Sequence, residues 1–279
     1  MDDRRTQELH ALIDEWPVTH AAVGAARRDA AGHTNPAVIH GDDALGFELA
    51  SVTKLLTATA VLVACEEEIV GLDDAVDGVA GATVRHLLAH ASGLGPDGQV
   101  LAPPGTRRIY SNAGFDLLGE IVTRASGLPF ATYLTEAVLT PLGMHATRLD
   151  GSPASGAVST VADLRRFAAE LLAPDLLATS TVATASTVAF PGLAGVLPGY
   201  GRQAPNDWGL GFELRATKSP HWTGERNSPA TFGHFGRAGT FLWVDPVAGV
   251  ALVCLTDRPF GARALPRWPA LSDAVLAAG

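Results

Sequence analysis

The order in which strand-like and helix-like segments follow one another limits the fold of this chain most. Near the N-terminus, the runs "AAVGAARRD" and "PAVIHGDD" are β-like and end in turn residues, which predicts a hairpin. From about residue 51 to about residue 172 the apolar spacing is mostly helical, and after residue 205 strand-like runs return. This order favours one antiparallel sheet assembled from the N- and C-terminal segments and flanked by helices, with a mostly helical part inserted.

Four strands are expected after residue 205, where the inserted helical part ends. They are "WGLGFELR", "ATFGHFG", "GTFLWVDP" and "GVALVCLTD", with the turn "DPVAG" between the last two. Helices are expected at 6–16, 51–66, 83–90, 112–126, 130–139, 161–172 and 262–277. We therefore predict an α/β fold of the α+β sandwich type that forms a single domain over 1–279. Its α/β part would take about 1–60 and 205–279, its helical part about 61–204, and its active site the cleft between them.

Composition narrows the classes of partner. Hydrophobic residues make up 47% of the chain and charged residues 18%, as in globular proteins. A net charge of −9 disfavours nucleic acids and anionic membranes, which bind basic patches.

The uncharged stretch 176–201 holds too many Gly and Pro residues for a membrane span. We expect it to be a mobile surface segment that borders the cleft together with the loop "HWTGERNSPA". Because the N-terminus shows no apolar signal region, we expect a cytoplasmic protein.

The chain uses lysine sparingly, and one of its two lysines lies inside an apolar helical segment. Arginine cannot lose its proton inside a protein, whereas a partly buried lysine can, so a site that needs a neutral amine must keep lysine. In "FELASVTKLLT", Lys54 follows Ser51 by one helical turn, so both side chains project from one face. A neutral Lys54 could act as the base that activates the Ser51 hydroxyl. The alternative is that Ser51 caps the helix and Lys54 extends along it to solvent.

A second segment, "PPGTRRIYSNAGFDLLGEI", places two polar side chains after a Pro-Gly turn and before a helix. Tyr110 could share a proton with Lys54 and pass it to a leaving group. Asn112 carries both a donor and an acceptor with which to hold a substrate amide or carbonyl. The alternative is an ordinary helix entry in which Ser111 or Asn112 is a cap.

A third segment, "FGHFGRAGTFLWVDP", reads as a strand that carries His234 and Gly236. A glycine at position 236 would let a ligand approach the backbone closely. The Arg237 N–H could then join the Ser51 N–H in an oxyanion hole. The alternative is a strand with a glycine kink and a half-buried histidine.

Together, in this order and spacing, the three segments resemble the serine β-lactamase and penicillin-binding protein superfamily, in particular its class C-like branch of esterases, D-aminopeptidases and DD-peptidases. The segments "VRHLLAHASGL", "LTPLGMHAT" and "GAVSTVADLRRFA" resemble further landmarks of that family, so the resemblance covers most of the chain. It implies Ser51 as the acyl-forming nucleophile and Lys54 with Tyr110 as the proton-transfer pair. For enzymes with this Ser-x-x-Lys motif the identity of the base is disputed, so we leave it open between Lys54 and Tyr110.

The resemblance also implies roles for the residues around the nucleophile. Asn112 would orient the substrate, and His234 would form a polar wall of the cleft. The Ser51 and Arg237 amides would form the oxyanion hole. It makes His86 and His90 structural residues at a helix end; a metal site is disfavoured because Leu87 stands where a His-Glu-x-x-His motif needs glutamate.

The third segment departs from the family pattern at two positions. Phe235 stands where the family has a small hydroxyl residue that hydrogen-bonds a substrate carboxylate, and His234 replaces a lysine. A histidine is mostly neutral at pH 7, so the positive field is weaker. Both changes argue against efficient hydrolysis of penicillins or D-Ala-D-Ala peptides and favour an uncharged acyl substrate. If strand alternation turns Phe235 into the core, this argument loses force.

We therefore predict a serine hydrolase that needs no cofactor or metal and acts on a small-molecule acyl substrate, most simply as an esterase or amidase. The alternatives are a β-lactamase, a D-Ala-D-Ala-type peptidase and a non-catalytic ligand-binding member of the same fold. An acyltransferase is a further variant, because an alcohol or amine can replace water as the acyl acceptor. No binding to nucleic acid or membrane is expected.

Overall fold

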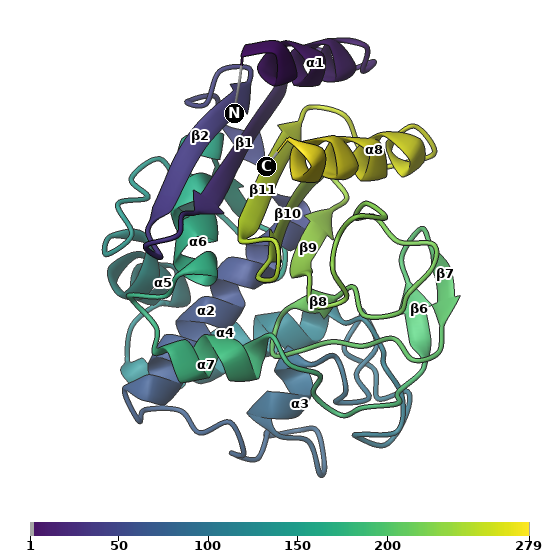
Figure 1. Ribbon diagram of the computed structural model, residues 1–279. Coiled ribbons are helices and arrows are strands. Elements are labelled where there is room, and N and C mark those ends of the chain that lie inside the picture. The colour runs from purple at the N-terminus through teal and green to yellow at the C-terminus, as the bar shows by residue number, and fades with distance from the viewer. Residues whose placement is uncertain (1–2, 279) are drawn as a thin grey trace.

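The computed structural model describes residues 3–278 and centres on a six-stranded sheet (Figure 1). The strand order is β2-β1-β11-β10-β9-β8, and every neighbouring pair is antiparallel. The strands are β1 (Ala21–Arg28), β2 (Thr34–His40), β8 (Glu213–Leu214), β9 (Phe232–Gly236), β10 (Thr240–Asp245) and β11 (Val250–Thr256). The N-terminal hairpin joins the C-terminal strands where β1 pairs with β11, for example at Gly24 and Val253. The predicted fold class is confirmed.

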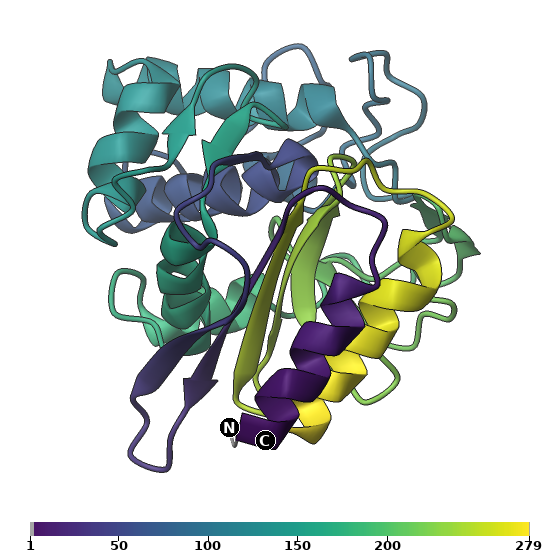
Figure 2. The ribbon, with the colours of Figure 1, turned by 90° about the horizontal axis from the view of Figure 1, so that it is seen from above.

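Helices cover both faces of this sheet. In Figure 2, α1 (Asp3–Asp14) and α8 (Ala264–Ala277) lie side by side on one face, while α6 (Val161–Leu172) packs on the other. Side chains of β11 alternate between two apolar cores. Val253 belongs to the core that includes α6, and Leu252 belongs to the core beneath α1 and α8. Burial on both faces explains why β11 reads as a continuous apolar run.

The inserted part is organised around one buried helix. The 3-10 turn η1 (Ala50–Val52) leads into α2 (Thr53–Glu66), in which every residue from Thr53 to Ala64 is buried. It contacts α4 (Asn112–Ser126), α5 (Phe130–Leu134) and the π-helical turn η2 (Thr135–Leu139), and its first turn reaches β9. Helix α3 (Val84–Leu88) contacts α4. Because α2 is enclosed from Thr53 to Ala64, the charged residue within that stretch, Lys54, is buried too.

Two expectations about the chain after residue 175 are met only in part. The run "WGLGFELR" pairs with the sheet over Glu213–Leu214 alone, because the preceding residues bond elsewhere: the Leu210 N–H donates to the Ala185 carbonyl and the Gly211 N–H to the Leu88 carbonyl. The stretch 176–201, expected as a mobile segment, contains a helix and part of a hairpin. These elements are α7 (Thr179–Ala185), β6 (Gly195–Leu197) and its partner β7 (Gly201–Gln203).

A further small sheet had no signal in the sequence. It joins β3 (Phe47–Glu48), β5 (Ala157–Ser159) and β4 (Arg148–Leu149), and it fixes the chain just before η1. Among residues 3–278, no helix combines the length and the apolar character that crossing a bilayer requires. The proposed division of the chain near residues 60 and 205 stays a prediction.

Candidate active site

Ser51 lies at the junction between the sheet and the helical part. It occupies η1, and the residue before it, Ala50, has a φ of +46°, a left-handed conformation that costs a non-glycine residue energy. Strand β9 and the start of β10 hold this turn in place. The Thr240 hydroxyl donates to the Leu49 carbonyl at 2.8 Å, and a Cβ at Gly236 would lie 2.2 Å from the same oxygen. The glycine at 236 therefore admits the backbone that carries the serine.

Lys54 is buried beneath Ser51 among neutral oxygen atoms. Its Nζ lies 2.7 Å from the Asn112 side-chain oxygen, 2.8 Å from the Ala154 carbonyl and 3.5 Å from the Ser51 Oγ. Burial lowers the pKa of Lys54 to about 7, although the negative charge of Asp116 acts in the opposite direction. A substantial fraction of the amine is therefore uncharged near neutral pH.

Tyr110 approaches Ser51 from the other side. Its hydroxyl donates to the Ser51 Oγ at 2.7 Å, and burial raises the pKa of the phenol well above its ordinary value. The ring packs against that of His90, whose centroid is 4.6 Å away. His90 is buried, and its Nδ1 accepts the Ser111 N–H, so it supports the backbone beside Tyr110. The structure thus leaves Tyr110 protonated.

His234 faces Tyr110 from β9 and is uncharged. Its Nδ1 lies 2.6 Å from the Phe235 carbonyl oxygen, which can only accept, so we assign the ring proton to Nδ1. The unprotonated Nε2 then lies 3.4 Å from the Tyr110 hydroxyl. Burial, with the nearby Lys54 as a second cause, lowers the pKa of His234 to about 3. The histidine contributes a hydrogen-bond acceptor to the site and no positive charge.

These side chains surround a cavity of about 200 Å³. It is lined by Ser51, Tyr110, Asn112, Leu197, Pro198, Trp208, Glu213, His234, Phe235 and Arg237. Leu197 and Pro198 come from the stretch 176–201 that was expected to border the cleft, whereas the loop 221–230 contributes no lining residue. Gly236 and Lys54 lie behind the lining.

Two backbone N–H groups at the cavity are free. Among residues 3–278, neither the Ser51 N–H nor the Arg237 N–H has a backbone acceptor. The turn that carries Arg237 is held by a hydrogen bond from the Gly239 N–H to the Gly236 carbonyl and by one from the Phe260 N–H to the Arg237 carbonyl. Free donors on a fixed turn are what an oxyanion hole requires.

Phe235 touches the cavity but belongs mainly to a core. It is 7% exposed, and its ring lies 5.0 Å from Phe260, 5.8 Å from Trp222 and 5.9 Å from Trp268, measured between centroids. The alternation of β9 has therefore placed this ring in the aromatic layer beneath α8. This position weakens the argument that its missing hydroxyl alone determines the substrate.

Glu213 and Trp208 were missed by the sequence reasoning. Glu213 is buried and bonds Lys218, the His221 Nε2 at 2.9 Å and the Trp222 Nε1 at 2.6 Å. Burial alone would raise the pKa of Glu213, but His221 and Lys218 lower it to about 2. The sequence signal available for Glu213 was a single carboxylate inside the apolar run "WGLGFEL". The Ala154 carbonyl had no signal, because it is a backbone group 100 residues from Lys54.

A family model described as Beta-lactamase matches residues 14–276. The chain belongs to the beta-lactamase family. A solved structure of a beta-lactamase from Mycobacterium bovis is 58% identical, with a TM-score of 0.92 over 96% of this chain and 98% of that one. The motif resemblance to the serine β-lactamase and penicillin-binding protein superfamily is thereby confirmed.

More distant relatives and structural neighbours extend the comparison. A penicillin-binding protein of Bacillus subtilis is 33% identical over 37% of this chain and 30% of its own length. The chain thus spans less than half the length of the curated relatives it matches. EstCE1, a hydrolase with promiscuous acyltransferase activity, has a TM-score of 0.77 at 20% identity over 98% of both chains, which shows a shared fold.

Proposed function

We propose that this protein is a serine hydrolase that acts through a Ser51 acyl-enzyme, as an esterase or amidase on a small uncharged acyl substrate. The observation that carries the proposal is the meeting of three groups. The Tyr110 hydroxyl bonds the Ser51 Oγ at 2.7 Å, and the Lys54 amine, with a pKa of about 7, lies 3.5 Å from the same oxygen. If Ser51 only capped the helix, the fold would not need to bury the Lys54 amine and the Tyr110 phenol beside it.

Lys54 is the base that the geometry favours. A neutral amine has two N–H donors and one lone pair, and the Asn112 and Ala154 oxygens take up both donors. The lone pair is then left to accept the Ser51 proton while Oγ bonds the acyl carbon. The carbonyl electron pair moves onto its oxygen, where the Ser51 and Arg237 N–H groups stabilise the negative charge.

Tyr110 acts on the leaving group. Its raised pKa keeps the phenol protonated, so it is a donor and not a base in the resting site. As the bond from the acyl carbon to the leaving oxygen or nitrogen breaks, Tyr110 gives that atom its proton and is reprotonated at the expense of the Lys54 ammonium. Hydrolysis reverses these transfers: water adds to the acyl carbon, loses a proton to Lys54, and Ser51 leaves as the alcohol.

The charges around the cavity support an uncharged acyl group. His234 is neutral, and the Glu213 carboxylate faces the same cavity, so an anionic group would meet no charge partner there except Arg237 at the rim. The second candidate is a β-lactamase, and two observations favour it. The Mycobacterium bovis relative at 58% identity carries that name, and Arg237 offers a cation to a carboxylate.

The test compares the turnover of two substrates, both of which would react with Ser51. The protein should turn over 4-nitrophenyl butyrate with a higher kcat/KM than a chromogenic cephalosporin, and a fluorophosphonate should label Ser51. Ser51→Ala should lose labelling and at least about a thousandfold of the ester activity, whereas Ser180→Ala, an exposed serine on α7, should change neither. Faster cephalosporin turnover would select the second candidate. Unlabelled Ser51 with no turnover would indicate a ligand-binding protein.

A further inference from the structure

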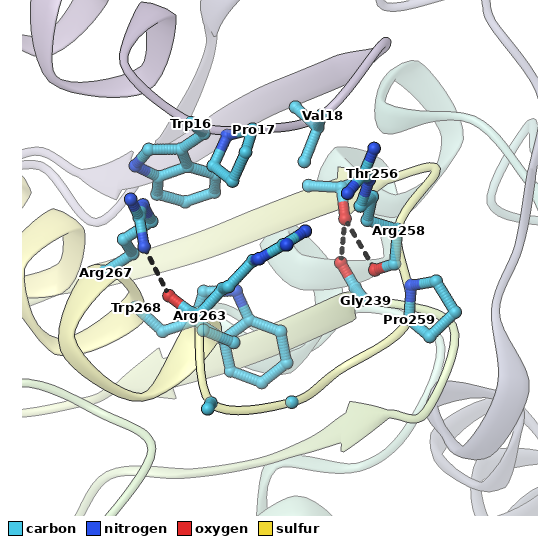
Figure 3. A pocket seen from close by; sticks show the side chains of 13 residues that line it. Trp16, Pro17, Val18, Gly239, Thr256, Arg258, Pro259, Arg263, Arg267 and Trp268 are labelled. Atoms are coloured by element: carbon cyan, nitrogen blue, oxygen red, sulfur yellow. Dashed lines mark hydrogen bonds between the residues drawn. The ribbon is translucent and has the colours of Figure 1, made fainter.

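A second cavity, of about 300 Å³, lies where the chain leaves α1 and where it enters α8 (Figure 3). Trp16 and Trp268 provide aromatic walls, and Arg258, Arg263 and Arg267 provide charged ones. It shares no lining residue with the active-site cavity. Its volume is at the lower end of the range for small-molecule sites. We call it the arginine pocket.

Among the described residues, the three arginines of this pocket have no carboxylate partner. The lining includes no Asp or Glu, and none of the three guanidinium groups forms an ion pair with a carboxylate among the side chains that the structure describes. Arg267 donates to the Arg263 carbonyl at 2.9 Å, which keeps these two residues together. In a chain with a net charge of −9, three unpaired arginines around one cavity create a local positive field.

The apolar walls come from large rings held in fixed positions. Trp16 is 7% exposed and Trp268 is 2% exposed, and the Trp268 ring packs 5.1 Å from Phe241 of the sheet. The buried Trp16 Nε1 has no hydrogen-bond partner within the part of the chain that the structure describes. Figure 3 shows Arg263 and Arg267 beside these two indole rings and Arg258 across the pocket, next to Thr256. A rigid aromatic surface beside guanidinium groups suits a ligand with an apolar body and an anionic end.

We propose that the arginine pocket binds a small amphipathic anion, with an aromatic or aliphatic body against the Trp16 and Trp268 rings and a carboxylate or phosphate at Arg263 and Arg267. Guanidinium groups bind carboxylates and phosphates alike in bidentate fashion, so the pocket selects the anionic oxygen atoms that the two groups share. The ligand differs in charge from the uncharged acyl group proposed for the active site.

A binding experiment must distinguish binding at the arginine pocket from binding at the active site, because hydrogen bonds connect the two. The Thr256 hydroxyl, in the pocket wall, donates to the Gly239 carbonyl at 2.8 Å. Gly239 in turn closes the turn that carries Arg237. Arg237→Gln therefore serves as the control for binding at the active site, and Arg226→Gln, an exposed residue outside both cavities, as the control for net charge.

The experiment is calorimetric titration with 4-phenylbutyrate, phenyl phosphate and the neutral 4-phenylbutanol. Either anion should bind at least tenfold more tightly than the alcohol, and the tighter of the two identifies the anionic group. Arg263→Gln with Arg267→Gln should weaken anion binding at least tenfold, and the Lys double variant should restore part of it. Both control variants should stay within about twofold of the unaltered protein.

Four outcomes would overturn the proposal, and none depends on catalysis. The proposal fails if the alcohol binds as tightly as the anions, if the double Gln variant binds normally, or if binding is lost in Arg237→Gln instead. Absence of anion binding at millimolar concentrations would overturn it equally. Circular dichroism of the double variants shows whether they fold, and the Lys variant keeps the test valid if the Gln variant does not.

Discussion

Both lysines of this chain are buried, yet their surroundings differ. Lys218 is 4% exposed and bonds the Glu213 carboxylate, whereas Lys54 is fully buried and bonds neutral oxygens alone. Burial lowers the pKa of both amines, but at Lys218 the charge of Glu213 opposes that effect. A paired lysine stabilises structure, and an unpaired buried one can exchange protons near neutral pH.

The pH dependence of catalysis should report the titration of Lys54. Because burial lowers its pKa to about 7, the amine is protonated below that pH and cannot accept the Ser51 proton. We expect kcat/KM for a neutral ester to rise with pH and level off above about pH 7. Initial rates between about pH 5 and pH 9 measure this profile.

Lys54→Arg tests the assignment, because arginine keeps the charge and cannot lose it. We expect a loss of at least about a hundredfold at every pH and no inflection near neutrality. A variant that retained the inflection would show that another group titrates. Thermal unfolding of the variant, followed by circular dichroism, separates loss of chemistry from loss of fold.

At the scale of elements, the absence of a side chain at Gly24 allows α6 to approach the sheet closely. Gly24 lies in the middle of β1, and a Cβ there would be 2.6 Å from the Val161 Cγ1 and 2.5 Å from the Arg165 Cδ. Real Cβ atoms do not approach other atoms so closely, so α6 rests directly on the β1 backbone. Any side chain at position 24 must displace the Val161 and Arg165 side chains or push the helix away.

Gly24→Ala should therefore destabilise the fold by about 1–3 kcal/mol, the usual cost of overpacking a core. The matched control is Gly46→Ala, because a Cβ at Gly46 meets nothing closer than 3.8 Å and its backbone is not left-handed. Urea denaturation of both variants measures the difference. Equal midpoints for the two variants would show that α6 can shift without cost.

The short strand β8 is held in place by a buried charge cluster. Glu213 joins Lys218, His221 and Trp222, which follow it in the same loop. His221 and Lys218 lower the pKa of Glu213 to about 2 against the cost of burial. A carboxyl group whose pKa is lower in the folded state stabilises the fold above its unfolded pKa, and that stabilisation is lost as pH falls toward the folded value.

We therefore expect stability to decrease between about pH 4.5 and pH 2, by about 3 kcal/mol from this residue. Glu213→Gln should lower stability at neutral pH by about 3–5 kcal/mol, because Lys218 is left buried without its counter-charge, and should flatten the acid dependence. Glu225→Gln, an exposed acid nearby, is the control. An unchanged pH profile in Glu213→Gln would contradict the assignment.

At the scale of the whole molecule, the sequence predicted what depends on neighbours along the chain and missed what depends on distant contacts. Strand and helix periodicity predicted a sheet made from both chain ends, and two short motifs carried Ser51, Lys54 and Tyr110. The hairpin of β6 and β7 was missed, because β6 is placed by a bridge to Arg108, far back in the sequence. The lining residues Trp208 and Glu213 likewise reach the cavity only through tertiary packing.

Long-range packing also determines how the molecule should unfold. One apolar core includes Leu242 of the sheet together with Phe115 of α4 and Leu134 of α5, so the α/β part and the helical part share buried surface. The strands β1 and β11 pair across most of the sequence, so neither chain end can complete the sheet alone. A shared core predicts that the two parts lose structure together, although chains of this length often unfold in steps.

We expect tryptophan fluorescence, which reports on five tryptophans that all lie in the α/β part, to change at the same denaturant concentration as far-UV circular dichroism. Leu134→Ala in the helical part and Leu252→Ala in the sheet, both fully buried, should each cost about 2–5 kcal/mol and move both signals together. If Leu134→Ala shifted the dichroism while the fluorescence midpoint stayed in place, the helical part would be an independent folding unit. The predicted single domain would then be wrong, and Ser51 would lie at an interface between two domains.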